Sequence, residues 1–189
     1  MLLNIIDEVN KALDNDMYIS ALALVLTIPD ICAKAEYPLE KTNKKRYVDW
    51  FDNHIGHYEQ PPEKGIDDKC PHLSGEVIYT LRNSILHQGT PNIDKDKIKN
   101  EDNKIDRFVL VKEPKKEIQN YSDFSSCSET GWMLRGDKIN KMYHLNIRRL
   151  CFLITSAAEY YYEENKEKFD FFNYTMVDKG HEFDDLFNI

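Results

Sequence analysis

The sequence predicts an all-α protein: an antiparallel bundle of about five helices with a small β-hairpin or irregular insertion. Three observations support this fold class. Apolar residues recur at intervals of three and four over most of the chain. The periodic segments are separated by short turns or by stretches rich in Pro, Gly, Asn and Asp. No internal repeat is visible, so we expect one packed unit.

The chain has 189 residues, of which 41% are hydrophobic and 31% are charged, a composition that suits one domain with a substantial core. We assign residues 1–168 to the helical domain, with the insertion at about 90–136. Residues 169–189 form an acidic, aromatic C-terminal tail. The tail holds five acidic residues against Lys179 alone, and so contributes half of the net charge of −8.

The N-terminal half predicts three helices. Residues 2–13 place Leu, Ile and Val at helical spacing, and residues 14–16 supply a turn. Residues 17–37 are apolar over most of the helix circumference, which predicts a central buried helix that Pro29 kinks or breaks near Ile28. Residues 42–56 predict a third helix, with Thr42 as its cap.

A fourth helix is predicted from Leu73 or Ser74 to His87 or Gln88, with Ser74 as N-cap and Gly89 after its end. Residues 57–72 before it read as a loop, and residues 90–106 after it as a solvated loop or short exposed helix.

The C-terminal half predicts a hairpin and one long helix. The run RFVLV, residues 107–111, is of β type, and GWMLRG, residues 131–136, is its expected partner. Apolar residues then follow helical steps from Asp137 to about Lys168. We expect the tail to dock on the bundle through Phe171, Phe172, Tyr174 and Phe187.

Composition excludes several classes of protein. A signal peptide and a long uninterrupted apolar run are both missing, so we expect a cytoplasmic protein with no membrane partner. The four cysteines are widely spread and form no Cys-x-x-Cys pair, which argues for reduced thiols. The negative net charge argues against a protein that coats nucleic acid nonspecifically, but it is compatible with a small local RNA site.

The fourth helix has a second face that its core stripe does not cover. At about 100° per residue, Leu73, Val77, Ile78, Leu81 and Ile85 form the core stripe. Tyr79, Asn83 and Leu86 lie in the middle of the opposite strip, with Arg82 and His87 on its two margins. Tyr and Leu there suggest a covering surface, either the same helix of a second copy or another helix of the same chain.

The segment RNSILH, residues 82–87, fits the Arg-x(4 to 6)-His pattern and in this respect resembles the HEPN superfamily, in which a polar residue such as Asn83 often follows the Arg. Many HEPN proteins are metal-independent endoribonucleases that act as homodimers, and others are inactive binding modules. The resemblance therefore implies a homodimer, RNA as substrate or ligand, and no cofactor or metal.

The resemblance also implies roles for three residues. His87 would take the proton from a ribose 2′-OH or protonate the leaving 5′-oxygen. Arg82 would hold the scissile phosphate and stabilise the charge of its transition state. Asn83 would orient the imidazole or bond the phosphate. Tyr79, Leu86 and Asn83 would form the dimer interface.

Other candidate sites are weaker. His54, His57, Cys70 and His72 lie close in sequence, but their spacing does not suit the common zinc sites.

Ser84 lacks the surroundings of a nucleophile, so we interpret it as a small packing residue. Arg148 and Arg149 would extend a phosphate-binding rim, or else lie on a solvated face or in salt bridges. No Gly-rich phosphate loop occurs.

Two functions from different classes remain open. The first is a cytoplasmic HEPN-like homodimer that cuts or binds RNA, of the kind used in toxin or phage-defence systems. The second is a non-catalytic helical interaction module in which the Tyr79 and Leu86 face only makes the dimer. In a third arrangement, the acidic tail folds over the cleft that Arg82 and His87 of the two copies would form, and regulates it.

Overall fold

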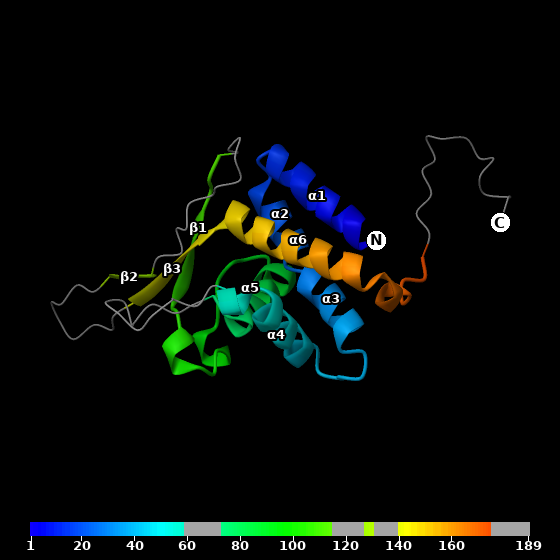
Figure 1. The fold of residues 1–189 in the computed structure, drawn as a ribbon. Coiled ribbons are helices and arrows are strands. Elements are labelled where there is room, and N and C mark those ends of the chain that lie inside the picture. The colour runs from blue at the N-terminus through cyan, green and yellow to red at the C-terminus, as the bar shows by residue number, and fades with distance from the viewer. Residues whose placement is uncertain (59–72, 115–126, 131–139, 175–189) are drawn as a thin grey trace.

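The computed structural model describes residues 1–58, 73–114, 127–130 and 140–174 (Figure 1). These ranges contain six α-helices, four short 3-10 turns and a three-stranded sheet. The predicted predominance of helix is confirmed. In Figure 1 the sheet lies at one end of the molecule, and helix α6 runs from it across the other helices.

Helices α1 (Leu2–Asp14), α2 (Tyr18–Val25) and α3 (Ile28–Glu36) form the N-terminal part. The predicted break near Ile28 is confirmed, because Pro29 lies in the first turn of α3, where its missing N–H breaks no hydrogen bond. One segment, Tyr18–Glu36, is long and apolar enough to cross a membrane by length and composition. It consists of α2 and α3, and 56% of its apolar window is buried inside the fold.

Helices α4 (Asn43–His54) and α5 (Gly75–Gln88) pack against each other. Both were predicted, and the ends of α5 are those expected from its capping residues. The Ser74 hydroxyl accepts a hydrogen bond from the Val77 amide, and Gly89 ends the helix with φ 67°. Residues 59–72, which contain most of the predicted loop, lie outside the described residues.

The sheet differs from the predicted hairpin. Strand β1 (Arg107–Val111) pairs in parallel with β3 (Asn140–Asn146), and β2 (Cys127–Thr130) pairs antiparallel with the other edge of β3. The described partner of β1 is therefore β3, and the expected partner, residues 131–136, lies outside the described residues. The sheet order is β1-β3-β2.

The prediction that the last helix starts near Asp137 was wrong. Helix α6 spans Ile147–Glu164, and the preceding residues form β3. Met142, Tyr143 and Leu145 are buried in that strand, so pairing and burial in the sheet override a spacing that also suits a helix. Asn146 marks the change, because its side chain accepts a hydrogen bond from the Arg149 amide at the N-terminus of α6.

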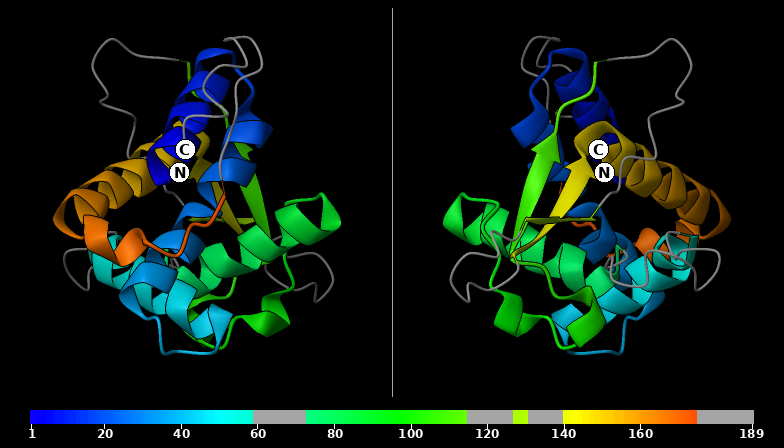
Figure 2. Two further views of the ribbon diagram at one scale, coloured as in Figure 1. Left: turned by 90° about the vertical axis from the view of Figure 1, so that its right-hand side faces the viewer. Right: turned by 90° about the vertical axis from the view of Figure 1, so that its left-hand side faces the viewer.

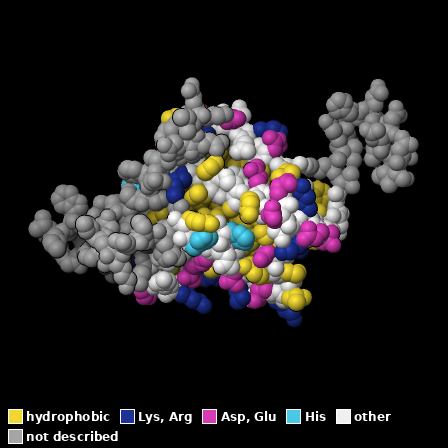
Figure 3. Space-filling view, viewed as in Figure 1, with side chains coloured by type: hydrophobic (Ala, Val, Ile, Leu, Met, Phe, Trp, Pro, Cys, Tyr) yellow, Lys and Arg dark blue, Asp and Glu magenta, His cyan; other side chains and the backbone are white. Residues whose placement is uncertain are grey.

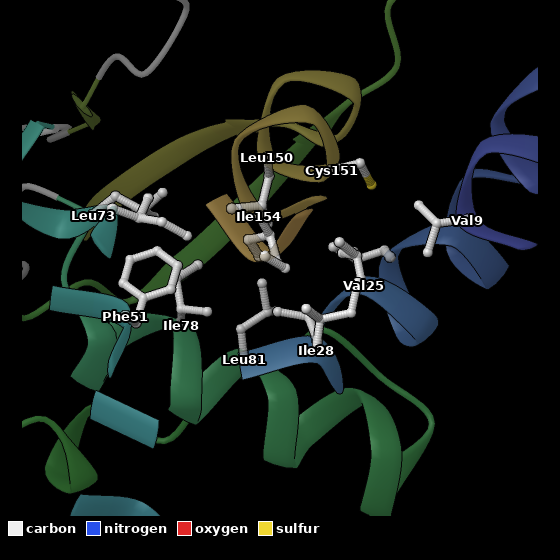
Figure 4. Close-up of a cluster of buried hydrophobic side chains, with 14 of the residues drawn as sticks. Val9, Val25, Ile28, Phe51, Leu73, Ile78, Leu81, Leu150, Cys151 and Ile154 are labelled. Carbon is white, nitrogen blue, oxygen red and sulfur yellow. The ribbon is translucent and has the colours of Figure 1, made fainter. Parts of the chain in front are cut away.

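One continuous core joins the helices, with α6 contacting α1, α2 and α3. Figure 4 shows side chains from different helices converging in it, among them Val9, Val25, Ile28, Ile78, Leu81 and Ile154. The segment 90–106 is less solvated than predicted, because Ile98 and Ile105 are fully buried beneath its short 3-10 turns.

The start of the C-terminal tail packs on the helices, as its aromatic residues predicted. Phe169 is buried at the end of a 3-10 turn, Lys166–Phe169, and Phe171 and Phe172 are half-buried against the core. Tyr174 is 47% exposed. Phe187 lies outside the described residues.

Candidate functional site

Helix α5 is held at its start and projects at its end. The Gly75 amide donates to the Asp52 side chain at 2.6 Å, and Gly75 lies so close to Val48 that an added Cβ would sit 2.7 Å from the Val48 carbonyl oxygen. Val77, Ile78 and Leu81 then bury the core face. The C-terminal turn of α5 projects from the body of the molecule (Figure 2), and Leu86, His87 and Gln88 are exposed there.

Three predicted site residues meet within this one chain. The Arg82 guanidinium donates through Nη1 to the Asn83 side-chain oxygen at 2.8 Å, and the same nitrogen lies 3.2 Å from His87 Nε2. Arg82 and His87 lie on the two margins of the second face of α5. They contact each other because the Arg82 side chain is long enough to reach along the helix. Arg can only donate hydrogen bonds, so His87 Nε2 accepts, which places the proton of the neutral ring on Nδ1.

A fourth residue, Asp30 of α3, completes the cluster. Its carboxylate lies 2.7 Å from Arg82 Nη2, with 26% of the Asp30 side chain and 20% of the Arg82 side chain exposed. Burial raises the pKa of Asp30 despite the neighbouring Arg82 charge, so desolvation outweighs the ion pair. Among the described residues, Arg82 Nε is buried and has no hydrogen-bond partner.

Sequence reasoning missed Asp30, although a signal for it was present. Asp30 is the only charged residue between Met17 and Ala33, in a segment that is otherwise almost entirely apolar. A carboxylate in such a segment requires a polar or charged partner, because burying a lone charge is costly.

The two apolar residues of the strip have different surroundings. The Tyr79 ring packs edge-on against Tyr47 of α4, with centroids 5.2 Å apart, and the Arg82 guanidinium carbon lies 5.9 Å from the Tyr79 ring centroid. Tyr79 is therefore covered in part by its own chain. Leu86, in the last turn of α5, is 37% exposed and has surface available for a partner.

Arg148 does not extend a phosphate-binding rim. It is buried, and it donates to the Leu13 carbonyl oxygen at 2.8 Å and lies 3.1 Å from the Asp16 carboxylate. It also donates to the Glu113 carbonyl oxygen, and so ties the end of β1 to the α1–α2 turn. Arg149 is half-buried in the first turn of α6.

The other candidate histidines that the structure describes pack against aromatic rings. His54 stacks on Trp50, with centroids 4.8 Å apart, and His57 packs on Tyr58. Cys70 and His72 lie outside the described residues, and within the described ranges no group of three or more His, Cys, Asp or Glu could hold a metal ion. Ser84 is buried, as expected of a packing residue.

Two of the cysteines, Cys32 and Cys151, are also buried. Cys32 and Cys151 are free thiols in the core, and burial raises the pKa of Cys151 to about 12. Such thiols are not reactive nucleophiles at neutral pH.

The cluster on α5 therefore combines a cation suited to phosphate with an imidazole and an amide, both of which contact that cation. Comparisons with protein-family models, curated proteins and solved structures gave no match.

Proposed function

We propose that the protein is a HEPN-like, metal-independent endoribonuclease that acts as a homodimer on single-stranded RNA. The observation that carries this proposal is the 3.2 Å approach of Arg82 Nη1 to His87 Nε2 at the projecting end of α5. A phosphate-binding cation and a proton-transfer group lie within the span of one phosphodiester. We interpret the helices as the antiparallel bundle of that superfamily, and the protein as cytoplasmic.

The proposed reaction is an internal transfer at phosphorus. Neutral His87 takes the proton of the ribose 2′-OH, the 2′-oxygen bonds to phosphorus, and the bond from phosphorus to the 5′-oxygen breaks. The leaving 5′-oxygen receives a proton from the second histidine of the dimer. The products are a 2′,3′-cyclic phosphate and a 5′-hydroxyl end.

Arg82 changes partners in this scheme. In the isolated chain its Nη1 occupies the lone pair of His87 Nε2. A bound phosphate would draw the guanidinium into a charge-assisted pair, which frees Nε2 to accept the ribose proton. Asn83, which already accepts from Arg82, would keep the guanidinium oriented.

The second copy of the chain would dock on Leu86. A two-fold axis near this exposed residue brings two His87 side chains and two Arg82 side chains to one cleft, and supplies the base and the acid from different chains. Tyr79 and Asn83 would line the same interface.

The test is cleavage of a single-stranded RNA in excess chelator by wild-type protein and by His87→Ala. We expect His87→Ala to lower the rate by about 10²- to 10⁴-fold, the usual effect of removing a general base. His57→Ala is the matched control, because His57 is also exposed and lies on another element. Equal cleavage by His87→Ala and wild type would refute the proposed mechanism, and uncut RNA with an intact dimer would favour the non-catalytic interaction module.

A further inference from the structure

A hollow of about 380 Å³ lies directly beside Arg82. Its walls come from α3, the first turn of α4, α5 and the beginning of the C-terminal tail. The ion pair of Asp30 and Arg82 lines it, and Phe172 and Tyr174 contribute aromatic side chains. The volume is near the lower end of the range for small-molecule sites and is suited to one nucleotide unit.

The hollow is positively charged in a protein of net charge −8. Lys34, Arg46 and Arg82 line it, and Asp30 is the one acidic residue among the described residues that line it. Arg46 donates to the Glu40 carbonyl oxygen and to the Asn43 side-chain oxygen, both uncharged acceptors, so these bonds leave its charge unneutralised. A second hollow of about 300 Å³ shares Lys34 and Arg46 and adds Lys168, which pairs with Glu36, and the acidic Asp170.

The aromatic side of the hollow is ordered by its own contacts. The Lys34 ammonium lies 4.3 Å from the Phe171 ring centroid, and Phe171 packs on Phe172 with centroids 4.6 Å apart. Tyr174 meets Phe172 edge-on and is 47% exposed, so ring surface remains available. Figure 2 shows residues 171–174, which carry these aromatic rings, running beside α3.

Cations next to exposed aromatic rings suit a single-stranded nucleic acid. Unpaired bases stack on aromatic side chains, while Lys and Arg contact the phosphates on either side. We infer that this hollow is a nucleotide subsite, which binds the RNA unit next to the scissile phosphate with its base on Tyr174 and its phosphate on Lys34 and Arg46. This inference rests on the proposed function, because it takes RNA as the substrate.

The test measures the affinity of a labelled single-stranded RNA by fluorescence anisotropy in chelator, with all variants made in the His87→Ala background. We expect Tyr174→Ala to weaken binding about tenfold, since one stacked base contributes roughly this much. Tyr174→Phe should retain the affinity because it keeps the ring. Tyr160→Ala is the control, because Tyr160 is 72% exposed on α6 and does not line the hollow.

A second ligand separates stacking from charge. Inorganic polyphosphate carries the charge of RNA without bases, so Tyr174→Ala should leave its binding unchanged. Lys34→Ala should weaken the binding of both ligands several-fold, relative to Lys11→Ala on α1. RNA affinity that is equal in Tyr174→Ala and the parent protein would overturn the subsite.

The outcomes distinguish the two proposals. RNA that is cut with His87 dependence but bound without Tyr174 dependence refutes the subsite and keeps the nuclease. RNA that is bound with Tyr174 dependence but never cut refutes the nuclease and keeps the subsite.

Discussion

At the residue scale, Arg82 has different partners at its two terminal nitrogens. Nη1 holds Asn83 and His87, and Nη2 holds the Asp30 carboxylate. A substrate phosphate would compete with Asp30 for the guanidinium, because both are anions that seek the same donors. In the proposed enzyme, Asp30 both holds Arg82 in place and opposes RNA binding.

This competition predicts the effect of Asp30→Asn. The amide keeps an oxygen that accepts from Arg82 but removes the negative charge. We expect RNA affinity to rise about fivefold at low salt, which corresponds to roughly 1 kcal/mol for unit charges about 4 Å apart in water. Anisotropy titration against Asp7→Asn on α1 measures this change. Unchanged or weaker binding would show that Asp30 does not oppose the phosphate.

Asp30 also predicts a dependence of stability on pH. Burial raises its pKa above the ordinary 3.8, so the folded state binds the proton more readily than the unfolded state. Between 3.8 and the raised value, stability must therefore fall as pH rises. Urea denaturation should show wild type losing stability relative to Asp30→Asn as pH rises through this window. A constant difference between the two proteins would contradict the raised pKa.

The sequence indicated Arg82, Asn83 and His87 because they form one short motif. It did not indicate the contact of Arg82 with Asp30, because that ion pair joins residues 52 positions apart (82 − 30) on two helices whose relative placement no local pattern reveals. For Arg148 the sequence left a phosphate-binding rim, a solvated face and a salt bridge open, and the structure has the salt bridge, with Asp16. The sequence could not identify its partners, for a related reason. Its partners are backbone carbonyl oxygens and Asp16, which no pattern around residue 148 reveals.

At the scale of elements, the site depends on the close approach of α4 and α5. Gly75 permits it, since an added Cβ would lie 2.7 Å from the Val48 carbonyl oxygen and 2.9 Å from Val48 Cα. These are backbone atoms, which cannot move aside without shifting α4.

We therefore predict that Gly75→Ala lowers the free energy of unfolding by about 1–3 kcal/mol, the usual cost of overpacking. Gly89→Ala is the comparison. Its Cβ would meet nothing within 4 Å, and its φ of 67° alone costs about 1 kcal/mol. Urea denaturation ranks the two variants. A smaller loss for Gly75→Ala than for Gly89→Ala would contradict the close packing.

Element ends were predictable where a local signal exists. Pro29 marked the break between α2 and α3, and Ser74 and Gly89 marked the ends of α5. The segment 140–146 could not be assigned in this way. Its apolar spacing suits a helix, and it becomes a strand because β1, more than 30 residues earlier, pairs with it.

At the scale of the whole molecule, acidic and basic side chains are scattered as separate groups over the face seen in Figure 3. No continuous Lys and Arg patch covers the described part of that face. Together with the net charge of −8, this suggests that an RNA ligand would be held at a local site, such as the one around Arg82, Lys34 and Arg46. This arrangement suits cleavage of single-stranded segments better than coating of long nucleic acids.

The proposed dimer gives a prediction at this scale. Leu86→Glu places a charge at the expected two-fold axis, so we expect a particle of 22.3 kDa in place of one with twice that mass, together with loss of cleavage. Leu39→Glu is the control, because Leu39 is 92% exposed in the turn after α3. Light scattering after gel filtration gives the masses. A wild-type monomer that cuts RNA at full rate would contradict the shared cleft.

The most direct test of the central claim is the chemistry of the RNA ends. Mass spectrometry of fragments made in excess chelator should find 2′,3′-cyclic phosphates and 5′-hydroxyls with wild type, and no such fragments with His87→Ala. Fragments with 3′-hydroxyl and 5′-phosphate ends, or the same cyclic ends from His87→Ala, would contradict the account.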